Sequence, residues 1–147
     1  MRTNQDVCPA NQDQKPPAPF LAGQPGCGVH RVWLVDDDDE FRRLLGQLLN
    51  TVRGMRCPRG FAAPELLLSA LQEETPPETI LLDVHLRHRN GIDFIRPIRA
   101  LAPGTRVIML STFYDSEHAR RALHAGAYRF LVKTSSIGEI VQQILEN

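Results

Sequence analysis

The sequence of 147 residues has no excess of charge, because its 17 basic residues equal its 17 acidic residues. This balance gives no general electrostatic reason for binding nucleic acid or an anionic membrane, although a small basic patch is compatible with it. No apolar stretch is long enough to span a bilayer, and no apolar segment follows the basic residue at the N-terminus. We therefore expect a cytoplasmic protein that carries no signal peptide and makes no contact with a membrane.

Cysteine is also scarce. Cys8, Cys27 and Cys57 are odd in number, lie far apart and lack the CxxC or histidine-flanked spacing of metal sites. This pattern indicates free thiols in a reducing compartment, and it argues against a disulfide framework or a zinc site. We expect Cys57 to be a small residue of the core.

Residues 1–29 differ in composition from the rest of the chain. Five prolines alternate there with Asn, Gln, Gly and Ala. Such a segment buries too little apolar surface to offset the entropy lost when it becomes ordered. We predict a flexible, Pro-rich N-terminal tail over residues 1–29 and one domain over residues 30–147.

From His30 onward, apolar strands alternate with amphipathic helices. The apolar runs typical of buried parallel strands lie at residues 32–35, 80–82, 107–110 and 128–132. A weaker strand at 55–61 contains Pro58, which has no amide hydrogen, so we predict that this strand lies at a sheet edge. Helical spacing of apolar residues marks residues 41–52, 64–71, 92–101, 115–125 and a last helix that Ser135 or Ser136 caps. Pro97 predicts a kink or a ragged segment in the third of these helices.

Five strands in alternation with five helices predict an α/β fold. We expect a doubly wound, five-stranded parallel sheet with helices on both faces. In such sheets, ligands bind outside the carboxyl ends of the strands. The functional residues should therefore follow the ends of the strands.

Polar side chains stand at four of these strand ends: Asp36 with Asp37, then Asp83, Ser111 and Lys133. Two carboxylates about 4 Å apart repel each other by about 4 kcal/mol at an effective dielectric constant near 20. A hard divalent cation with oxygen ligands, such as Mg²⁺, would compensate for this repulsion. A carboxylate beside Mg²⁺, a lysine and a hydroxyl can accept a phosphoryl group, because the cations neutralise the charge of the transition state.

The segments VWLVDDDDEFRRLL, ILLDVHLRHRNG, VIMLST and GAYRFLVK, in this order and spacing, resemble the signature segments of bacterial response-regulator receivers. The resemblance covers residues 30–147 and implies a flavodoxin-like sheet with the strand order 2-1-3-4-5. It also implies a Mg²⁺ site. Asp37 would be the most direct metal ligand and Asp36 would act closely or through water. Asp83 and the backbone carbonyl of His85 would complete the ligand set.

The same resemblance implies the parts of a switch. Asp83 would be the phosphoacceptor, and its donor would be a sensor histidine kinase or a phosphotransfer protein. Ser111 would sense the phosphoryl group, Lys133 would pair with it, and Phe130 would turn inward when the hydroxyl moves. Phosphorylation would then change partner binding, dimerisation through the last helices and strands, or transcriptional output. Nucleic acid would be bound only through an output domain, which this chain does not contain.

Two departures from the family pattern refine the resemblance. Thr134 follows Lys133 where the family often has proline, and this Lys-Thr pair resembles receivers of the NarL/LuxR type. The loop Leu86–Gly91 carries Arg, His and Arg where the family usually has a proline, which suggests a partner with an acidic surface.

Other interpretations of the same residues stay open. The run Asp36–Glu40 could be a solvated acidic helix start, and we favour that interpretation for Asp38, Asp39 and Glu40 only. The chain is expected to be a phosphoacceptor switch and not an enzyme. Its alternatives are a Mg²⁺-dependent phosphohydrolase with an aspartyl-phosphate intermediate and a non-phosphorylated binding module. The hydrolase usually needs a second acid two residues after its nucleophile, where this chain has His85.

Overall fold

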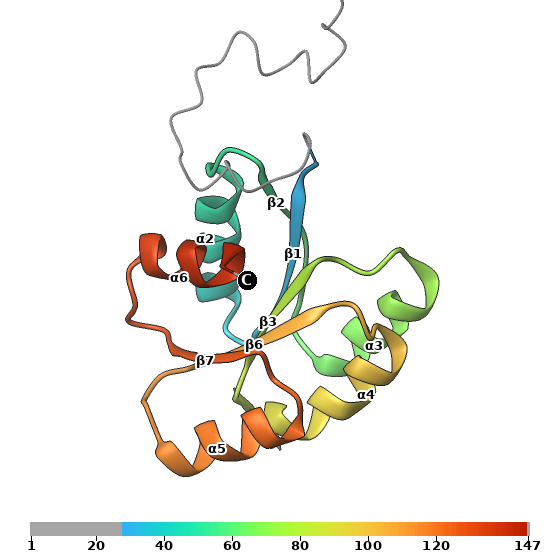
Figure 1. The fold of residues 1–147 in the computed structure, drawn as a ribbon, viewed down its shortest axis with the longest axis vertical. Coiled ribbons are helices and arrows are strands. Elements are labelled where there is room, and N and C mark those ends of the chain that lie inside the picture. Colours follow the sequence, from blue (N-terminus) through green and yellow to red (C-terminus); the bar gives the residue numbers. More distant parts are fainter. Residues whose placement is uncertain (1–27, 147) are drawn as a thin grey trace, which may run out of the picture.

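A computed structural model of the chain describes residues 28–146 and has an α/β fold (Figure 1). Its sheet consists of five parallel strands in the order β2-β1-β3-β6-β7. The strands are β1 (His30–Val35), β2 (Met55–Phe61), β3 (Thr79–Asp83), β6 (Arg106–Ser111) and β7 (Arg129–Val132). Counted along the chain, this is the predicted order 2-1-3-4-5, so the predicted fold is confirmed. Most of the predicted tail at residues 1–29, together with Cys8 and Cys27, lies outside the described residues.

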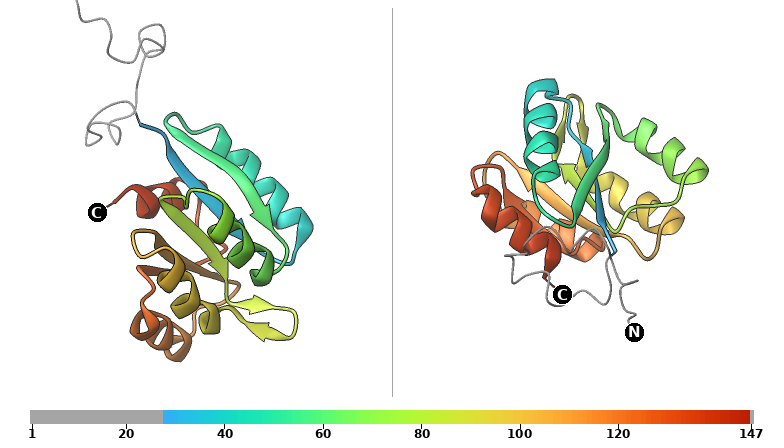
Figure 2. Two further views of the ribbon diagram at one scale, coloured as in Figure 1. Left: turned by 90° about the vertical axis from the view of Figure 1, so that its right-hand side faces the viewer. Right: turned by 90° about the horizontal axis from the view of Figure 1, so that it is seen from above.

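Helices cover both faces of the sheet. The α-helices among residues 28–146 are α2 (Asp39–Asn50), α3 (Pro64–Glu73), α4 (Ile95–Leu101), α5 (Ser116–Ala125) and α6 (Ile137–Leu145). Helices α2 and α6 lie on one side of the sheet, and α3 and α4 lie on the other (Figure 2). None of the helices in residues 28–146 has the length and apolar character that crossing a membrane requires.

Local sequence signals set several helix ends. The side chain of Asp115 accepts hydrogen bonds from two backbone amides at the start of α5. Gly126 ends that helix with a φ of 115°, a conformation that glycine adopts without strain. Ser136, and not Ser135, caps α6 through a reciprocal pair of hydrogen bonds with Glu139.

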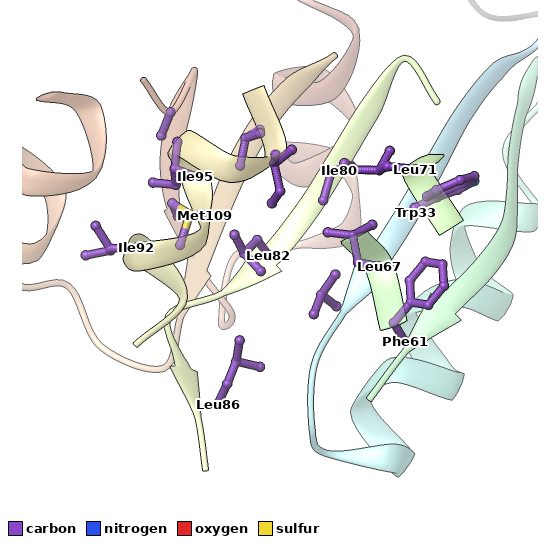
Figure 3. Close-up of a cluster of buried hydrophobic side chains, with 14 of the residues drawn as sticks. Trp33, Phe61, Leu67, Leu71, Ile80, Leu82, Leu86, Ile92, Ile95 and Met109 are labelled. Carbon is purple, nitrogen blue, oxygen red and sulfur yellow. The ribbon is translucent and has the colours of Figure 1, made fainter. Parts of the chain in front are cut away.

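Strand alternation divides the core into two clusters. Trp33 and Val35 of β1 point to the face covered by α3, α4 and α5, whereas Val32 and Leu34 point to the face covered by α2 and α6. Figure 3 shows the first cluster, in which Trp33, Phe61 and Leu67 pack together on that face. Because both faces of the three central strands are buried, their sequences are apolar almost throughout.

Three features differ from the predictions or refine them. Strand β2 is an edge strand, as Pro58 predicted, and its register with β1 shifts near that proline. The strand predicted at residues 128–132 is present as β7 and lies at the other edge, as the order 2-1-3-4-5 implies, but its four residues are half-buried, so the prediction of a fully buried strand is wrong. The segment after Asp83 is not a plain loop, since β4 (His85–Leu86) and β5 (Arg89–Asn90) form an antiparallel hairpin.

The ragged segment predicted at Pro97 is confirmed. A 3₁₀ turn, η3 (Gly91–Phe94), comes first, and α4 begins at Ile95. Pro97 therefore lies in the first turn of α4, where backbone amides have no partner within the helix and the missing hydrogen costs little.

Cys57 is half-buried beside the cluster under α2 and α6, and it is a free cysteine. Burial raises the pKa of its thiol to about 12. The side chain thus behaves as a small packing residue with little thiolate at neutral pH.

Candidate functional site

Three carboxylates meet at the carboxyl end of the sheet. Val35 pairs with Leu82 in adjacent parallel strands, so the residues that follow them emerge side by side. Asp36, Asp37 and Asp83 each offer a carboxylate oxygen, and these oxygens all lie within 4.8 Å of one another. Asp36 and Asp83 are only 3% and 4% exposed, while Asp37 is half-buried. The structure therefore brings together the acidic residues that the sequence placed at one edge of the sheet.

Short local hydrogen bonds orient two of these carboxylates. Asp36 Oδ1 accepts a hydrogen bond of 2.8 Å from the amide of Asp38, and Asp83 Oδ1 accepts one of 3.2 Å from the amide of His85. Asp38 itself caps α2 by accepting hydrogen bonds from the amides of Glu40 and Phe41. The acidic run thus divides as predicted, with Asp38 serving the helix.

Lys133 supplies the fixed positive charge of the site. Its Nζ lies 2.7 Å from Asp36 Oδ2 and 3.3 Å from Asp83 Oδ2. The amide of Lys133 donates a hydrogen bond of 2.7 Å to the carbonyl of Ser111, which ties the end of β7 to the end of β6. Burial alone would lower the pKa of Lys133, but the hydrogen bonds and charges of Asp36 and Asp83 together outweigh it and raise that pKa.

The ring of Phe41 lies beneath the same ammonium group, with 4.5 Å between Lys133 Nζ and the ring centroid. This is the range in which an aromatic face attracts a cation. Phe41 therefore limits the directions in which the lysine can point. The sequence pattern places Phe41 at the start of the helix predicted at residues 41–52 and gives no sign of this contact.

The surroundings of Asp83 disfavour the charge on its carboxylate. Burial, and after it the neighbouring charge of Asp36, raises the pKa of Asp83 to about 6, against the opposing effects of Lys133 and the His85 amide. Because burial and Asp36 disfavour the charged form of Asp83, any further positive charge near this carboxylate stabilises it. With a pKa of about 6, the group is still mainly ionised at neutral pH.

Ser111 and Phe130 lie on the neighbouring strands β6 and β7. Ser111 is 1% exposed, and its hydroxyl has no hydrogen-bond partner in residues 28–146. A buried hydroxyl without a partner costs about 1–3 kcal/mol, so it would gain from an acceptor brought to it. Phe130 is half-buried, and its ring meets Tyr114 edge-on at a centroid distance of 6.0 Å.

The β4–β5 hairpin borders the site on the side of Asp37. The amide of Arg87 donates a hydrogen bond of 3.0 Å to Asp37 Oδ2. Gly91 closes the hairpin against the end of β3, and a Cβ atom at this position would collide with the carbonyl oxygen of Asp83. The exposed ring of His85 lies 5.6 Å from the ring of His118, measured between centroids. Sequence reasoning noticed the basic character of this segment but not its contact with Asp37.

The donor set fits a hard divalent cation. All three side chains offer carboxylate oxygens, which Mg²⁺ and Ca²⁺ prefer, and no thiolate or imidazole belongs to the cluster found in residues 28–146. Lys133 balances only part of the three negative charges. These residues can therefore hold a hard divalent cation such as Mg²⁺ or Ca²⁺.

Comparisons with known proteins agree with this geometry. Residues 32–145 match the response regulator receiver domain family. The chain is 40% identical over 109 residues to protein-glutamate methylesterase/protein-glutamine glutaminase 3 of Burkholderia thailandensis, a match that covers 70% of this chain and 29% of that protein. The chain spans 29%, 32% and 52% of the first three curated relatives that it matches.

Two solved structures show the same fold. A response regulator from Burkholderia pseudomallei, with a phosphorylated aspartic acid and a calcium ion, has a TM-score of 0.71 and 25% identity over 78% of this chain and 65% of that one. A LuxR-family two-component response regulator from Aurantimonas sp. SI85-9A1 has a TM-score of 0.72 and 27% identity, covering 78% of this chain and 81% of that one.

Proposed function

The chain belongs to the response regulator receiver domain family, and from that premise we propose that Asp83 accepts a phosphoryl group and that Asp36, Asp37 and Lys133 prepare it to do so. One observation carries the proposal. The buried carboxylate of Asp83 has an oxygen within 4.8 Å of oxygens from two further carboxylates, and it lies 3.3 Å from Nζ of Lys133. That arrangement suits a nucleophile that must take up additional negative charge.

Mg²⁺ would be held by the carboxylates of Asp37 and Asp83, by Asp36 directly or through water, and by the backbone carbonyl of His85. When bound, the ion supplies positive charge for the phosphoryl oxygens and for the crowded carboxylates. Asp36 has a second task, because it holds Lys133 Nζ at 2.7 Å and so keeps that charge beside Asp83.

In the transfer step, a carboxylate oxygen of Asp83 attacks the phosphorus of a phosphohistidine on the donor protein. The bond from phosphorus to the imidazole nitrogen breaks, and the imidazole leaves with the electron pair and takes up a proton. Asp83 needs no general base for this step, because it is mainly ionised at neutral pH. Lys133 stays near the new phosphoryl oxygens and balances part of their charge.

Ser111 and Phe130 would respond to the phosphoryl charge by moving, and their movement would change the conformation of the protein surface. The unpartnered hydroxyl of Ser111 can donate to a phosphoryl oxygen, which satisfies a buried group that has no partner beforehand. Movement of Ser111 toward Asp83 frees space near β7, and Phe130 turns inward to fill it. Tyr114, which meets Phe130 edge-on and is 66% exposed, would report that movement at the surface.

The donor would be a sensor histidine kinase or a phosphotransfer protein. The output would be altered binding to a partner protein, to a second copy of the chain through the last helices and strands, or to an output domain that acts on transcription. The similarity to a LuxR-family regulator favours the transcriptional output. The similarity to a methylesterase shows that related receivers are also found in enzymes.

Labelling with a small phosphodonor tests the proposal. We expect incubation with acetyl phosphate and Mg²⁺ to attach one phosphoryl group per chain, stable in acid and labile in base as an acyl phosphate is. Asp83→Asn should take up none, whereas Asp93→Asn, which changes an exposed aspartate of η3, should be labelled like the wild type.

The same experiment separates the alternatives. Rapid turnover of many donor molecules per chain would favour a phosphohydrolase. Absence of label on the wild type would favour a binding module that keeps the receiver fold without phosphorylation. Label that persists in Asp83→Asn would contradict the assignment of the phosphoacceptor.

A further inference from the structure

The tip of the β4–β5 hairpin has an unusual backbone conformation. Arg87 has a φ of 52°, and it is the only residue other than glycine with a positive φ in residues 28–146. It occupies the first central position of a two-residue turn, where a positive φ is required and glycine is usual. A side chain held in this conformation at a functional site is a reason to ask what it does there.

Contacts on both sides of the hairpin tip fix the position of the Arg87 backbone. Leu86 is 3% exposed and belongs to the core cluster beneath α3 and α4. The amide of Gly91 donates a hydrogen bond of 2.6 Å to the carbonyl of Val84, at the base of the hairpin. Arg89 forms an ion pair with Glu65 on α3 and lies over the ring of Phe94. The tip is therefore placed by contacts on both sides of it.

This placement brings two donors of Arg87 to one oxygen atom. Its amide nitrogen lies 3.0 Å from Asp37 Oδ2, and its guanidinium Nε lies 3.9 Å from the same oxygen. Asp37 has no such contact with Lys133, whose ion pairs are with Asp36 and Asp83. The three carboxylates are thus paired with two cationic side chains. Lys133 pairs with the buried Asp36 and Asp83, and Arg87 pairs with Asp37.

We propose that Arg87 is a built-in counter-ion of Asp37 that competes with the divalent cation and so lowers the affinity of the site for Mg²⁺. The inference rests on the proposed metal site and goes beyond it, because it assigns the setting of the affinity to one residue of the hairpin. Both contacts of Arg87 go to Oδ2, which leaves Oδ1 of Asp37 for a metal ion. The guanidinium group therefore does not occupy the position of the metal ion. It competes by electrostatic repulsion, because its positive charge lies beside the same carboxylate.

The exposure of the pair sets the size of the effect. The side chain of Arg87 is 71% exposed and that of Asp37 is 23% exposed. Ion pairs this open to solvent are weak, so removing the guanidinium should tighten Mg²⁺ binding by about two- to fivefold. The gain should shrink at high ionic strength, because salt screens exposed charges.

The experiment is a calorimetric titration of the whole chain with MgCl₂ at low ionic strength. Arg87→Asn removes the charge but keeps the backbone amide, and asparagine tolerates the left-handed conformation. Arg87→Lys keeps the charge. Arg43→Gln removes one positive charge from an exposed position on α2 and serves as the control for net charge.

We expect Arg87→Asn to bind Mg²⁺ about two- to fivefold more tightly than the wild type, with Arg87→Lys and Arg43→Gln close to the wild type. Equal or weaker binding by Arg87→Asn would overturn the inference, and so would an equal gain in Arg43→Gln, which would reveal a general charge effect. Absence of Mg²⁺ binding by the wild type would instead overturn the proposed metal site, and the inference with it.

Discussion

The perturbed carboxyl group of Asp83 leads to a prediction about stability. In the absence of divalent cations, Asp83→Asn should raise the free energy of unfolding at pH 8. The reason is that the folded state holds the Asp83 carboxylate buried and close to Asp36, an arrangement that disfavours its charge. Asparagine removes that charge and keeps almost the same shape.

The pKa of Asp83 sets the magnitude. That pKa rises from 3.8 to about 6 in the folded protein, and about two pH units at about 1.4 kcal/mol each amount to about 3 kcal/mol. Below pH 3.8 the group is protonated in both states and costs nothing. Between pH 3.8 and pH 6 the unfolded chain loses its proton first, so the stability of the wild type falls as the pH rises. Above pH 6 the carboxylate is charged in both states and lowers the free energy of unfolding by the full amount. The gain in stability from Asp83→Asn is therefore greatest there.

Urea unfolding of the metal-free proteins, followed by the fluorescence of Trp33, measures this difference. The advantage of Asp83→Asn should be up to about 3 kcal/mol at pH 8 and should nearly vanish at pH 4. Asp93→Asn, the exposed control, should change stability by less than about 0.5 kcal/mol at either pH. Two results would refute this prediction. One is an Asp83→Asn protein that is less stable than the wild type at pH 8, and the other is a gain in the free energy of unfolding that is the same at pH 4 and pH 8.

Three further variants follow from the same site. Ser111→Ala removes a buried hydroxyl that has no partner, so calorimetry should find the unphosphorylated protein equally stable or more stable; a loss above about 1 kcal/mol would contradict this. Gly91→Ala should cost about 2 kcal/mol or more in urea unfolding, because its Cβ would meet the carbonyl of Asp83, while Gly104→Ala, which faces open space, should be nearly neutral. Lys133→Met should cost about 2–4 kcal/mol at pH 8 by leaving two buried carboxylates uncompensated, and an unchanged unfolding curve would count against its pairing.

The fold and the acidic cluster could be predicted because each rests on a short-range pattern. A strand buried on both faces needs an unbroken apolar run, and the runs before Asp36 and Asp83 are of this kind. Parallel strands all end at one edge, so their terminal polar residues meet there without any knowledge of loops. Pro58 marked an edge strand because it lacks the hydrogen that a second neighbour would require.

Other features depend on contacts that no local pattern encodes. The apolar run at residues 128–132 predicts a strand but not how deeply it is buried, because half-burial at a sheet edge depends on which elements cover it. The hairpin after Asp83 has two strands of two residues each, too short for any periodicity to show. The contact of Lys133 with Phe41 joins residues far apart in the chain. Arg87 has a positive φ without being glycine, so its backbone conformation carried no signal in the sequence.

The central claim is that Asp36, Asp37 and Asp83 share one divalent ion beside the carboxylate that accepts the phosphoryl group. Anomalous diffraction from crystals grown with Mn²⁺ in place of Mg²⁺ tests it most directly. We predict one strong anomalous peak at the carboxyl end of the sheet, within about 2.0–2.6 Å of oxygens from Asp37 and Asp83. A peak at another location, or no peak at concentrations of Mn²⁺ that support phosphorylation, would contradict the account.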